Sequence, residues 1–280
     1  MDFQLKVLLL SFTITVVASI ILIPILKRLK VGQNEREDGP ESHMIKQGTP
    51  TMGGIIIMIS VVLTSIAGFL YYYSKNDIGV ATRILPMVFI ALGFGTVGLV
   101  DDFKKIILKN TKGLKPAYKM LGLLIVSVVF VVYMTQVLKF STGTYIPFLK
   151  IFIDLPIWVY IPFAIFVILA TTNAVNLTDG VDGLAASVSA IIMTFFTVVA
   201  MMLDVKEITV FGGVVVGACL GFLLFNLHTA KVMMGDTGSL LLRRSYSISC
   251  IIFKNAIYIS ACCNNSNNRN IISYVTSVIL

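Results

Sequence analysis

The chain has 280 residues, of which 57% are hydrophobic and only 13% are charged. The charged share is about half that of ordinary soluble domains, which excludes a soluble globular protein, a disordered chain and a secreted disulfide scaffold. Lys and Arg outnumber Asp and Glu by 22 to 14, and in so apolar a chain this excess indicates the cytoplasmic side of a membrane rather than nucleic-acid binding.

Long uncharged runs predict the architecture. A helix needs roughly 20 apolar residues to cross the hydrocarbon core of a bilayer. Seven uncharged runs approach or exceed this length, at residues 7–26, 47–74, 84–100, 120–138, 155–178, 183–203 and 208–230. Because lipid does not tolerate open backbone, each run predicts one helix. We therefore expect an all-α, polytopic membrane bundle with about seven clear spanning helices, forming one domain over residues 1–240.

The loops between these runs alternate between the two sides of the membrane. Twelve Lys and Arg residues fall on one side, in the loops at 27–46, 101–119, 179–182 and 231–236. Six fall on the other side, at the N-terminus and in the loops at 75–83, 139–154 and 204–207. The positive-inside rule places the first side in the cytoplasm. We therefore expect an external N-terminus.

Three clusters of carboxylates share the expected cytoplasmic side. Asp101 and Asp102 end one apolar run, and Asp179 and Asp182 stand beside glycines. Asp236 follows the uncharged run at 208–230 and also stands beside a glycine. Each cluster alone fits a helix cap or an ordinary turn. Together they favour a divalent cation, because Mg²⁺ binds one or two carboxylates along with substrate phosphates. Such a site would serve phosphoryl transfer.

Six motifs, in order, resemble those of the phospho-N-acetylmuramoyl-pentapeptide-transferases, which belong to the polyprenyl-phosphate N-acetylhexosamine-1-phosphate transferase superfamily. The motifs are Arg36-Glu-Asp-Gly-Pro-Glu-Ser-His43, Gly48-Thr-Pro-Thr-Met-Gly-Gly54, Val100-Asp-Asp-Phe-Lys-Lys105, Asn173-Ala-Val-Asn-Leu-Thr-Asp-Gly-Val-Asp-Gly-Leu-Ala185, Phe225-Asn-Leu-His228 and Met234-Gly-Asp-Thr-Gly-Ser239. The resemblance covers roughly residues 1–239. It implies a multi-pass enzyme of the bacterial inner membrane, with its active site on the cytoplasmic face. Such an enzyme transfers phospho-MurNAc-pentapeptide from UDP-MurNAc-pentapeptide to undecaprenyl phosphate, giving lipid I and UMP, with Mg²⁺ as cofactor.

The resemblance also implies roles for individual residues. The catalytic set would be Asp101, Asp102, Asp236 and Lys119. The metal ligands would be Asp102, Asp179 and Asp236. Substrate binding would fall to Asn176, Asp179, Asp182, Lys46, His43 and Thr51. The implied partners are the two substrates and membrane lipid, with no nucleic acid, and a homodimer is left open.

The last forty residues depart from the family, whose members have ten helices. Residues 241–280 contain no glycine and no acid, but they hold six Asn and three of the four Cys. Their longest uncharged run has 14 residues, from 255 to 268. We expect no further spanning helix there, and we interpret 241–280 as an aberrant tail, read out of frame, that leaves the chain weakly active or inactive.

Three alternative functions stay open. A sibling enzyme would transfer GlcNAc-1-phosphate to a polyprenyl phosphate, but the Glu-Asp-Gly-Pro and Gly-Thr-Pro-Thr-Met-Gly-Gly stretches favour the pentapeptide enzyme. A transporter would use its carboxylates to bind cations, but transporters place such groups near the bilayer midplane. The third alternative is a catalytically dead truncation product of the family.

Overall fold

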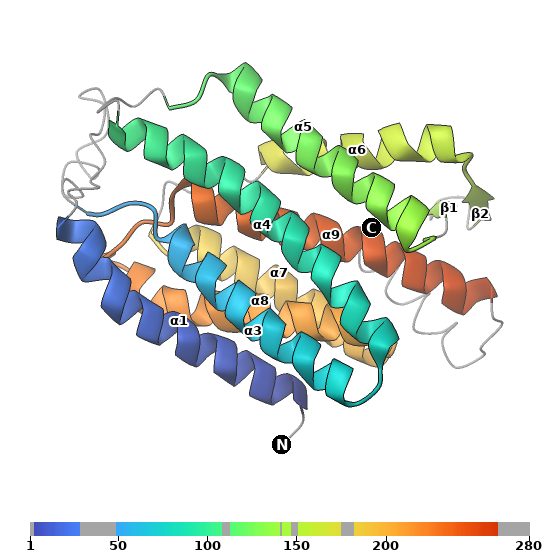
Figure 1. Ribbon diagram of the computed structural model, residues 1–280, viewed down its shortest axis with the longest axis horizontal. Coiled ribbons are helices and arrows are strands. Elements are labelled where there is room, and N and C mark those ends of the chain that lie inside the picture. Colours follow the sequence, from blue (N-terminus) through green and yellow to red (C-terminus); the bar gives the residue numbers. More distant parts are fainter. Residues whose placement is uncertain are drawn as a thin grey trace.

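The computed structural model describes residues 3–28, 49–107, 113–140, 142–146, 151–174 and 182–262. Within these ranges the chain forms eight α-helices and one two-stranded hairpin (Figure 1). The helices are α1 (Phe3–Arg28), α3 (Gly54–Ser74), α4 (Ile78–Ile107), α5 (Pro116–Val132), α6 (Ile157–Ala174), α7 (Leu184–Met202), α8 (Lys206–Asn226) and α9 (Gly235–Cys262). A π-helical turn, Tyr133–Val137, extends α5.

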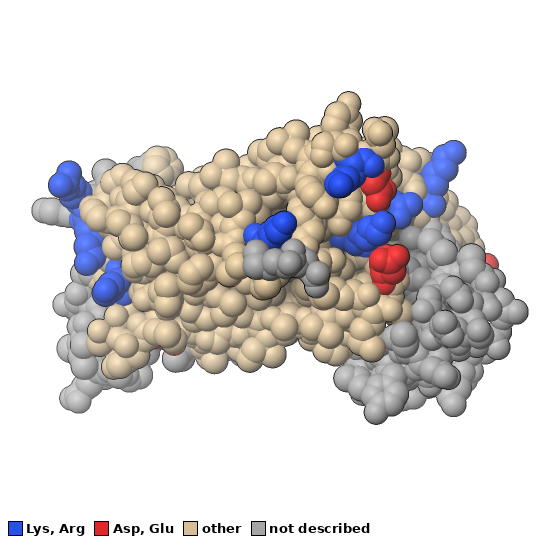
Figure 2. Space-filling view, turned by 90° about the horizontal axis from the view of Figure 1, so that it is seen from below, with Lys and Arg blue, Asp and Glu red and all other residues tan. Residues whose placement is uncertain are grey.

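The helices agree with the expected membrane bundle. Each of the seven uncharged runs overlaps one helix between α1 and α8, which confirms an all-α polytopic fold. Six helices of the described chain are long and apolar enough to cross a membrane, namely α1, α3, α4, α5 with its π-helical turn, α7 and α8. The apolar stretch of α6, Ile157–Leu169, is shorter. On the face seen in Figure 2, charged side chains lie at the left end and over the right-hand third, with one basic side chain near the middle, and most of the tan surface between them is uncharged.

Helix α8 lies inside the bundle, where α1, α3 and α7 pack around it (Figure 1). Small residues permit this packing, as they do between other membrane helices. A Cβ on Gly217 would overlap the backbone oxygen of Leu8 on α1. One turn further along α1, the Ser11 hydroxyl donates to the Val214 oxygen at 2.6 Å, so the polar group is satisfied inside the bundle.

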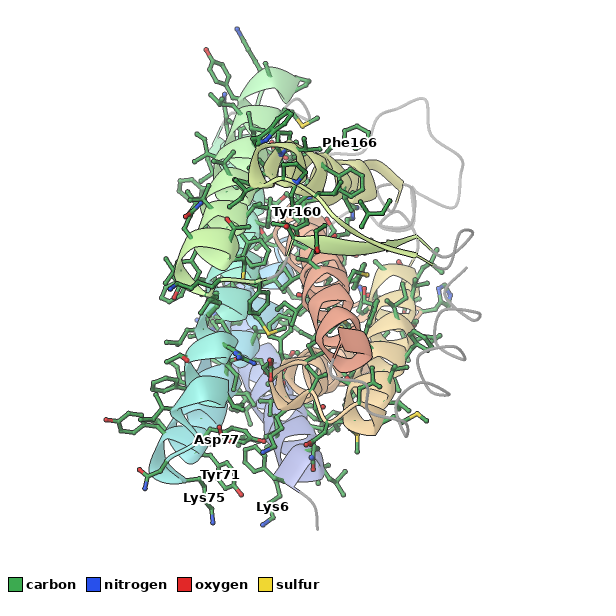
Figure 3. The ribbon with its side chains drawn as sticks, turned by 90° about the vertical axis from the view of Figure 1, so that its right-hand side faces the viewer. Lys6, Tyr71, Lys75, Asp77, Tyr160 and Phe166 are labelled. Atoms are coloured by element: carbon green, nitrogen blue, oxygen red, sulfur yellow. The ribbon has the colours of Figure 1, made fainter. Side chains whose placement is uncertain are left out.

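Successive helices run in opposite directions, so helix ends collect at the two ends of the bundle. At one end Lys6, Tyr71, Lys75 and Asp77 lie together (Figure 3). The ring of Tyr71 stacks on that of Phe3, with their centres 3.7 Å apart. At the opposite end the end of α4 contacts the first turns of α5 and α9. The end of α8 contacts the residue before α7, and the start of α3 contacts the segment before α9.

The hairpin was not expected. Strands β1 (Gly143–Ile146) and β2 (Ile151–Asp154) pair in antiparallel fashion, with Gly143 opposite Asp154. Both strands lie in the segment 139–154, which we expected to be an external loop. The strands are rich in β-branched and aromatic residues, which favour extended backbone, but each is too short to stand out from a loop by periodicity.

The residues after 239 continue a helix, α9, that the sequence did not predict. The expectation concerned spanning helices, and α9 is not among the six described helices that are long and apolar enough to cross a membrane. It continues for 28 residues, from Gly235 to Cys262. Arg243 and Arg244 lie in its interior turns with exposures of 3% and 0%, and the Arg244 guanidinium sits 4.2 Å from the centre of the Phe94 ring. The prediction relied on apolar length, whereas Leu, Ser and Arg all tolerate helical backbone.

Candidate active site

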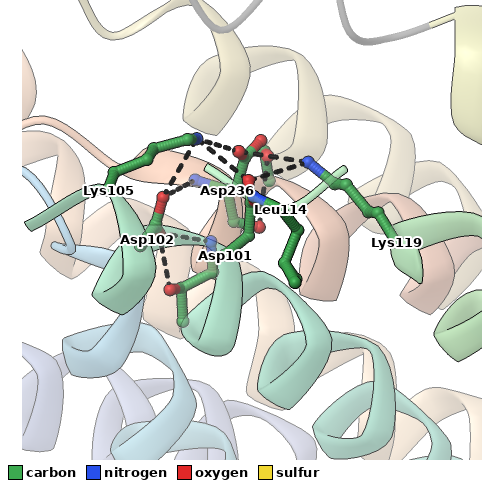
Figure 4. Close-up of polar contacts among 8 residues, drawn as sticks. Asp101, Asp102, Lys105, Leu114, Lys119 and Asp236 are labelled. Atoms are coloured by element: carbon green, nitrogen blue, oxygen red, sulfur yellow. Dashed lines mark hydrogen bonds and ion pairs between the residues drawn. The ribbon is translucent and has the colours of Figure 1, made fainter. Parts of the chain in front are cut away.

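Three carboxylates from two helices meet at the end of the bundle where α4 stops and α9 starts (Figure 4). Asp101 and Asp102 come from α4, and Asp236 comes from the first turn of α9. One oxygen from each lies within 4.8 Å of the other two. Asp101 and Asp102 are buried, and the Asp236 side chain is 18% exposed. The structure thus brings two of the three predicted acidic clusters into one site.

Asp102 is anchored by the helix that carries Asp236. Its Oδ2 accepts hydrogen bonds from the backbone N–H and the hydroxyl of Thr237, at 2.9 and 2.7 Å. Its Oδ1 accepts a longer bond, 3.2 Å, from the backbone N–H of Asp236. These are the unpaired donors of a helix N-terminus, where a carboxylate is favourable. Asp102 therefore acts as a cap for α9 from another helix.

Asp101 is anchored by the segment that leads into α5 rather than by α9. Its Oδ1 accepts a hydrogen bond of 2.7 Å from the backbone N–H of Leu114, in the segment that leads into α5. The preceding Gly113 has φ +53°, and a Cβ there would stand 2.7 Å from that same Oδ1. The second oxygen of Asp101, Oδ2, faces the lysines described below. Asp101 therefore has one oxygen held by backbone and one that faces the cluster, whereas both oxygens of Asp102 accept backbone hydrogen bonds.

Two lysines offset two of the three negative charges. Lys119, from the first turn of α5, places its Nζ 3.2 Å from Asp101 Oδ2 and 3.1 Å from Asp236 Oδ2. Lys105, from α4, contacts both residues of the aspartate pair and forms a hydrogen bond with Asp236. Burial opposes ionisation of Asp236, but the positive charges of Lys119 and Lys105 hold the pKa of its carboxyl below the ordinary value.

The donor set fits a divalent metal. Carboxylate oxygens are the hard ligands that Mg²⁺ and Mn²⁺ prefer. The three side chains approach one another closely enough for a shared cation to contact more than one of them. Their framework is held by backbone hydrogen bonds, so the oxygens that face the cluster keep their positions before any ligand arrives.

A glycine-rich segment packs against the start of α9. The backbone N–H groups of Gly53 and Gly54 donate to the oxygens of Met233 and Met234, at 2.9 and 2.8 Å. A Cβ on Gly54 would overlap the backbone nitrogen of Gly238. This close approach requires glycine and explains the Gly-Gly pair in the second motif. Thr51, a predicted substrate-binding residue, lies in this glycine-rich segment, which runs beside the residues that precede α9.

The end of α8 contacts the turn that carries Asp182. Asn226 is buried, and its Oδ1 accepts from the backbone N–H of Gly183 at 3.1 Å. Its Nδ2 donates to the Val232 oxygen at 2.8 Å. Asp182 Oδ2 lies 3.6 Å from Nδ1 of the exposed His228. Asn226 therefore ties the turn that carries Asp182 to the segment that leads into Asp236.

The predicted site residues fall into three groups. Asp101, Asp102, Asp236 and Lys119 come together as one cluster. Asp182 and Thr51 lie in the described structure but are not among the three grouped carboxylates or their lysines. Four predicted residues lie outside the described residues: His43, Lys46, Asn176 and Asp179.

Three residues that organise the site were not predicted from the sequence. Lys105 stands three and four positions after the aspartate pair, a spacing that places it on the same helix face, so helical periodicity could have identified it. Thr237 directly follows Asp236, which makes it a natural source of helix N-terminal donors. Asn226 lies in the motif Phe225-Asn-Leu-His228, but the motif gave it no role, because its two partners are distant in sequence or in a separate loop.

Comparison with known proteins agrees with the motifs. Residues 84–254 match the family model for glycosyl transferase family 4, and residues 46–58 match the model for phospho-N-acetylmuramoyl-pentapeptide-transferase signature 1. The first match ends inside α9, beyond the boundary near Leu240 that the motifs indicate.

Curated phospho-N-acetylmuramoyl-pentapeptide-transferases are similar over most of the chain. The enzyme of Acetivibrio thermocellus is 45% identical over 250 residues, which cover 89% of this chain and 72% of the relative. That of Clostridium novyi is 44% identical over 242 residues, covering 86% and 72%. That of Bacillus subtilis is 42% identical over 236 residues, covering 84% and 70%.

Proposed function

Because the chain belongs to the phospho-N-acetylmuramoyl-pentapeptide-transferase family, we propose that it transfers phospho-MurNAc-pentapeptide from UDP-MurNAc-pentapeptide to undecaprenyl phosphate. The products would be lipid I and UMP. The observation that carries this proposal is the convergence of three carboxylates and two lysines at one end of a membrane bundle. Such a site suits a reaction between a charged nucleotide-sugar and a phosphate carried in the bilayer.

We assign the cofactor as Mg²⁺, held by Asp102 and Asp236 with Asp179 as a further ligand. When bound, the metal would neutralise negative charge on the diphosphate that is cleaved. The donor chemistry of the cluster supports this choice, because Mg²⁺ prefers oxygen ligands and usually binds one or two carboxylates beside substrate phosphates.

The residues of the chain would divide the remaining work. Asp102 Oδ2 accepts two hydrogen bonds from Thr237, so the main role of Asp102 would be to orient α9 and the carboxylate oxygens that face the metal. Asp101 has Oδ2 directed into the cluster, and we assign it as the group that acts on the lipid phosphate, as nucleophile or base. Lys119 would hold a substrate phosphate as a point charge. Asn176, Asp182, Lys46, His43 and Thr51 would bind the nucleotide-sugar.

We propose that the active site lies on the cytoplasmic face of the bacterial inner membrane. Two facts support this orientation. The loops at the end that carries the cluster hold 12 of the Lys and Arg residues counted above, against 6 at the other end, as the positive-inside rule requires. The nucleotide-sugar is also a cytoplasmic metabolite, whereas undecaprenyl phosphate would enter from the bilayer. A homodimer stays a prediction, which light scattering on the purified protein would test.

The choice of sugar separates this function from that of the sibling GlcNAc-1-phosphate transferases. The match at residues 46–58 to a signature of the pentapeptide enzymes favours the first. The test is UMP release with undecaprenyl phosphate and Mg²⁺ by the chain whose reading frame after Leu240 is restored as proposed below, measured in parallel with UDP-MurNAc-pentapeptide and UDP-GlcNAc. We expect release from the first donor alone, and release from UDP-GlcNAc alone would reassign the enzyme.

We further propose that residues after about Leu240 are read out of frame. The support is compositional and structural: residues 241–280 lack glycine, and α9 buries Arg243 and Arg244. Back-translation permits a neighbouring frame that encodes Gly-Gly near these arginines and Ile-Glu-Thr later. Sequencing the DNA across codons 238–280 decides the matter, because a neighbouring frame without these stretches would end the proposal.

A further inference from the structure

Lys105 occupies the space between the three carboxylates. Its Nζ lies 3.0 Å from Asp101 Oδ2 and 3.6 Å from Asp102 Oδ1, and it forms a direct ion pair with Asp236 Oδ2 (Figure 4). Among the ion pairs of the described residues, no other ammonium contacts all three carboxylates. Lys119 contacts Asp101 and Asp236.

The same oxygens cannot serve Lys105 and a metal in this arrangement. A magnesium ion binds carboxylate oxygens at about 2.0–2.1 Å and demands near-octahedral geometry. An ion at that distance from any two of these oxygens would lie beside the Lys105 ammonium, with no group between the two positive charges. Two cations at such a separation in a partly buried site repel strongly.

The Lys105 ammonium is also able to move out of the carboxylate cluster. Its side chain is 34% exposed, and its flexible stem lets the ammonium move while the backbone of α4 stays in place. The carboxylates are not mobile in the same way, because the backbone N–H groups of Leu114 and Thr237 hold Asp101 and Asp102. Movement of the lysine is therefore the simplest way to make room for a metal.

We propose that Lys105 is a built-in counter-ion that competes with the divalent metal for the three carboxylates, and that metal binding displaces its ammonium from the cluster. Without metal, the lysine would keep the buried acids from repelling one another. This inference rests on the metal-binding part of the proposed function, and it concerns a residue for which the motifs imply no role.

Metal binding itself tests the proposal. Mn²⁺ is titrated into the detergent-purified full chain and followed by electron paramagnetic resonance. Binding that Asp236→Asn abolishes is assigned to the cluster. We expect Lys105→Met to bind Mn²⁺ about tenfold more tightly or better, because a competing positive charge is removed. Lys104→Met is the matched control: it removes the same charge one residue earlier, and Lys104 forms none of the described ion pairs with the cluster.

The unmodified protein provides a second measurement that needs no variant. Acetylation of lysine amines is measured by mass spectrometry with and without Mn²⁺. Displacement predicts that Mn²⁺ increases the acetylation of Lys105 and leaves that of Lys104 unchanged. This experiment decides the proposal if Lys105→Met does not fold.

The outcomes separate this inference from the proposed function. If the wild type binds Mn²⁺ and Lys105→Met binds it equally or more weakly, the role of Lys105 is refuted and the metal site stands. Protection of Lys105 from acetylation by Mn²⁺ would refute it as well. If neither the wild type nor Lys105→Met binds Mn²⁺, both the inference and the assigned metal site fail.

Discussion

The carboxylate of Asp102 accepts a hydrogen bond from the backbone N–H of Asp236, although 134 positions separate the two residues. The same carboxylate accepts two hydrogen bonds from Thr237, the next residue of α9. The first turn of α9 is thus fixed by an acid on α4, and the geometry of the carboxylate cluster depends on how these two helices pack. Asp102 contributes to stability as well as to the site.

Asp102→Asn should therefore lower both activity and stability. We expect turnover to fall by about 100-fold or more, since the loss of one transition-state contact costs about 3 kcal/mol. The thermal midpoint should fall too, because losing a helix cap costs about 1 kcal/mol. UMP release and thermal unfolding are the measurements. Asp77→Asn, at the opposite end and in an exposed pair with Lys206, should change neither. Wild-type turnover in Asp102→Asn would refute its role.

Asn226→Ala should loosen the turn that carries Asp182 from the segment that leads to Asp236. The substitution leaves the Gly183 N–H and the Val232 oxygen without the partner they have now. An unsatisfied buried polar group costs about 1–3 kcal/mol, so the thermal midpoint should fall. Asn226→Asp keeps the acceptor but places an anion against the Val232 oxygen, so it should destabilise as well. A thermal midpoint unchanged in both variants would contradict the account.

The orientation of the chain can be read from thiol labelling. A membrane-impermeant maleimide added to intact cells should label Asp77→Cys and not Asn110→Cys. The reason is the excess of Lys and Arg on the side that holds residues 101–119. The unsubstituted chain gives the background from its native cysteines. Labelling of Asn110→Cys without labelling of Asp77→Cys would reverse the orientation and move the active site to the outside.

Arg83→Met should lower the thermal midpoint. Arg83 pairs with Glu207 at 3.2 Å, and the Glu207 side chain is only 8% exposed. Removing one partner of this ion pair leaves a buried charge unpaired, which is destabilising. Thermal unfolding is the measurement, and an unchanged midpoint would show that this ion pair does not stabilise the protein.

The positions of the helices, and the end of the bundle at which the acids lie, could be predicted from the lengths and number of the uncharged runs. An uncharged run of bilayer length has few alternatives to a helix, and counting the crossings places Asp101, Asp102 and Asp236 at the same end. The prediction needed no knowledge of which helices touch.

The contacts inside the site could not be predicted in the same way. Whether Asp102 meets Thr237, or Asn226 meets Gly183, depends on the packing of helices that are distant in sequence. Helix α9 was not predicted for a different reason. Its charged and hydroxyl-bearing residues interrupt the apolar run on which a hydropathy-based prediction depends. The hairpin at Gly143–Asp154 was missed because each strand has only four residues.

The most direct test of the proposed function is Mg²⁺-dependent UMP release from UDP-MurNAc-pentapeptide in the presence of undecaprenyl phosphate. It should be measured for this chain, for the chain with the frame after Leu240 restored, and for Asp236→Asn in the restored chain. We expect the restored chain to form UMP and lipid I, this chain to be weakly active or inactive, and Asp236→Asn to lose about 100-fold or more of the restored rate. No release from either unsubstituted chain, or equal release from Asp236→Asn, would contradict the account.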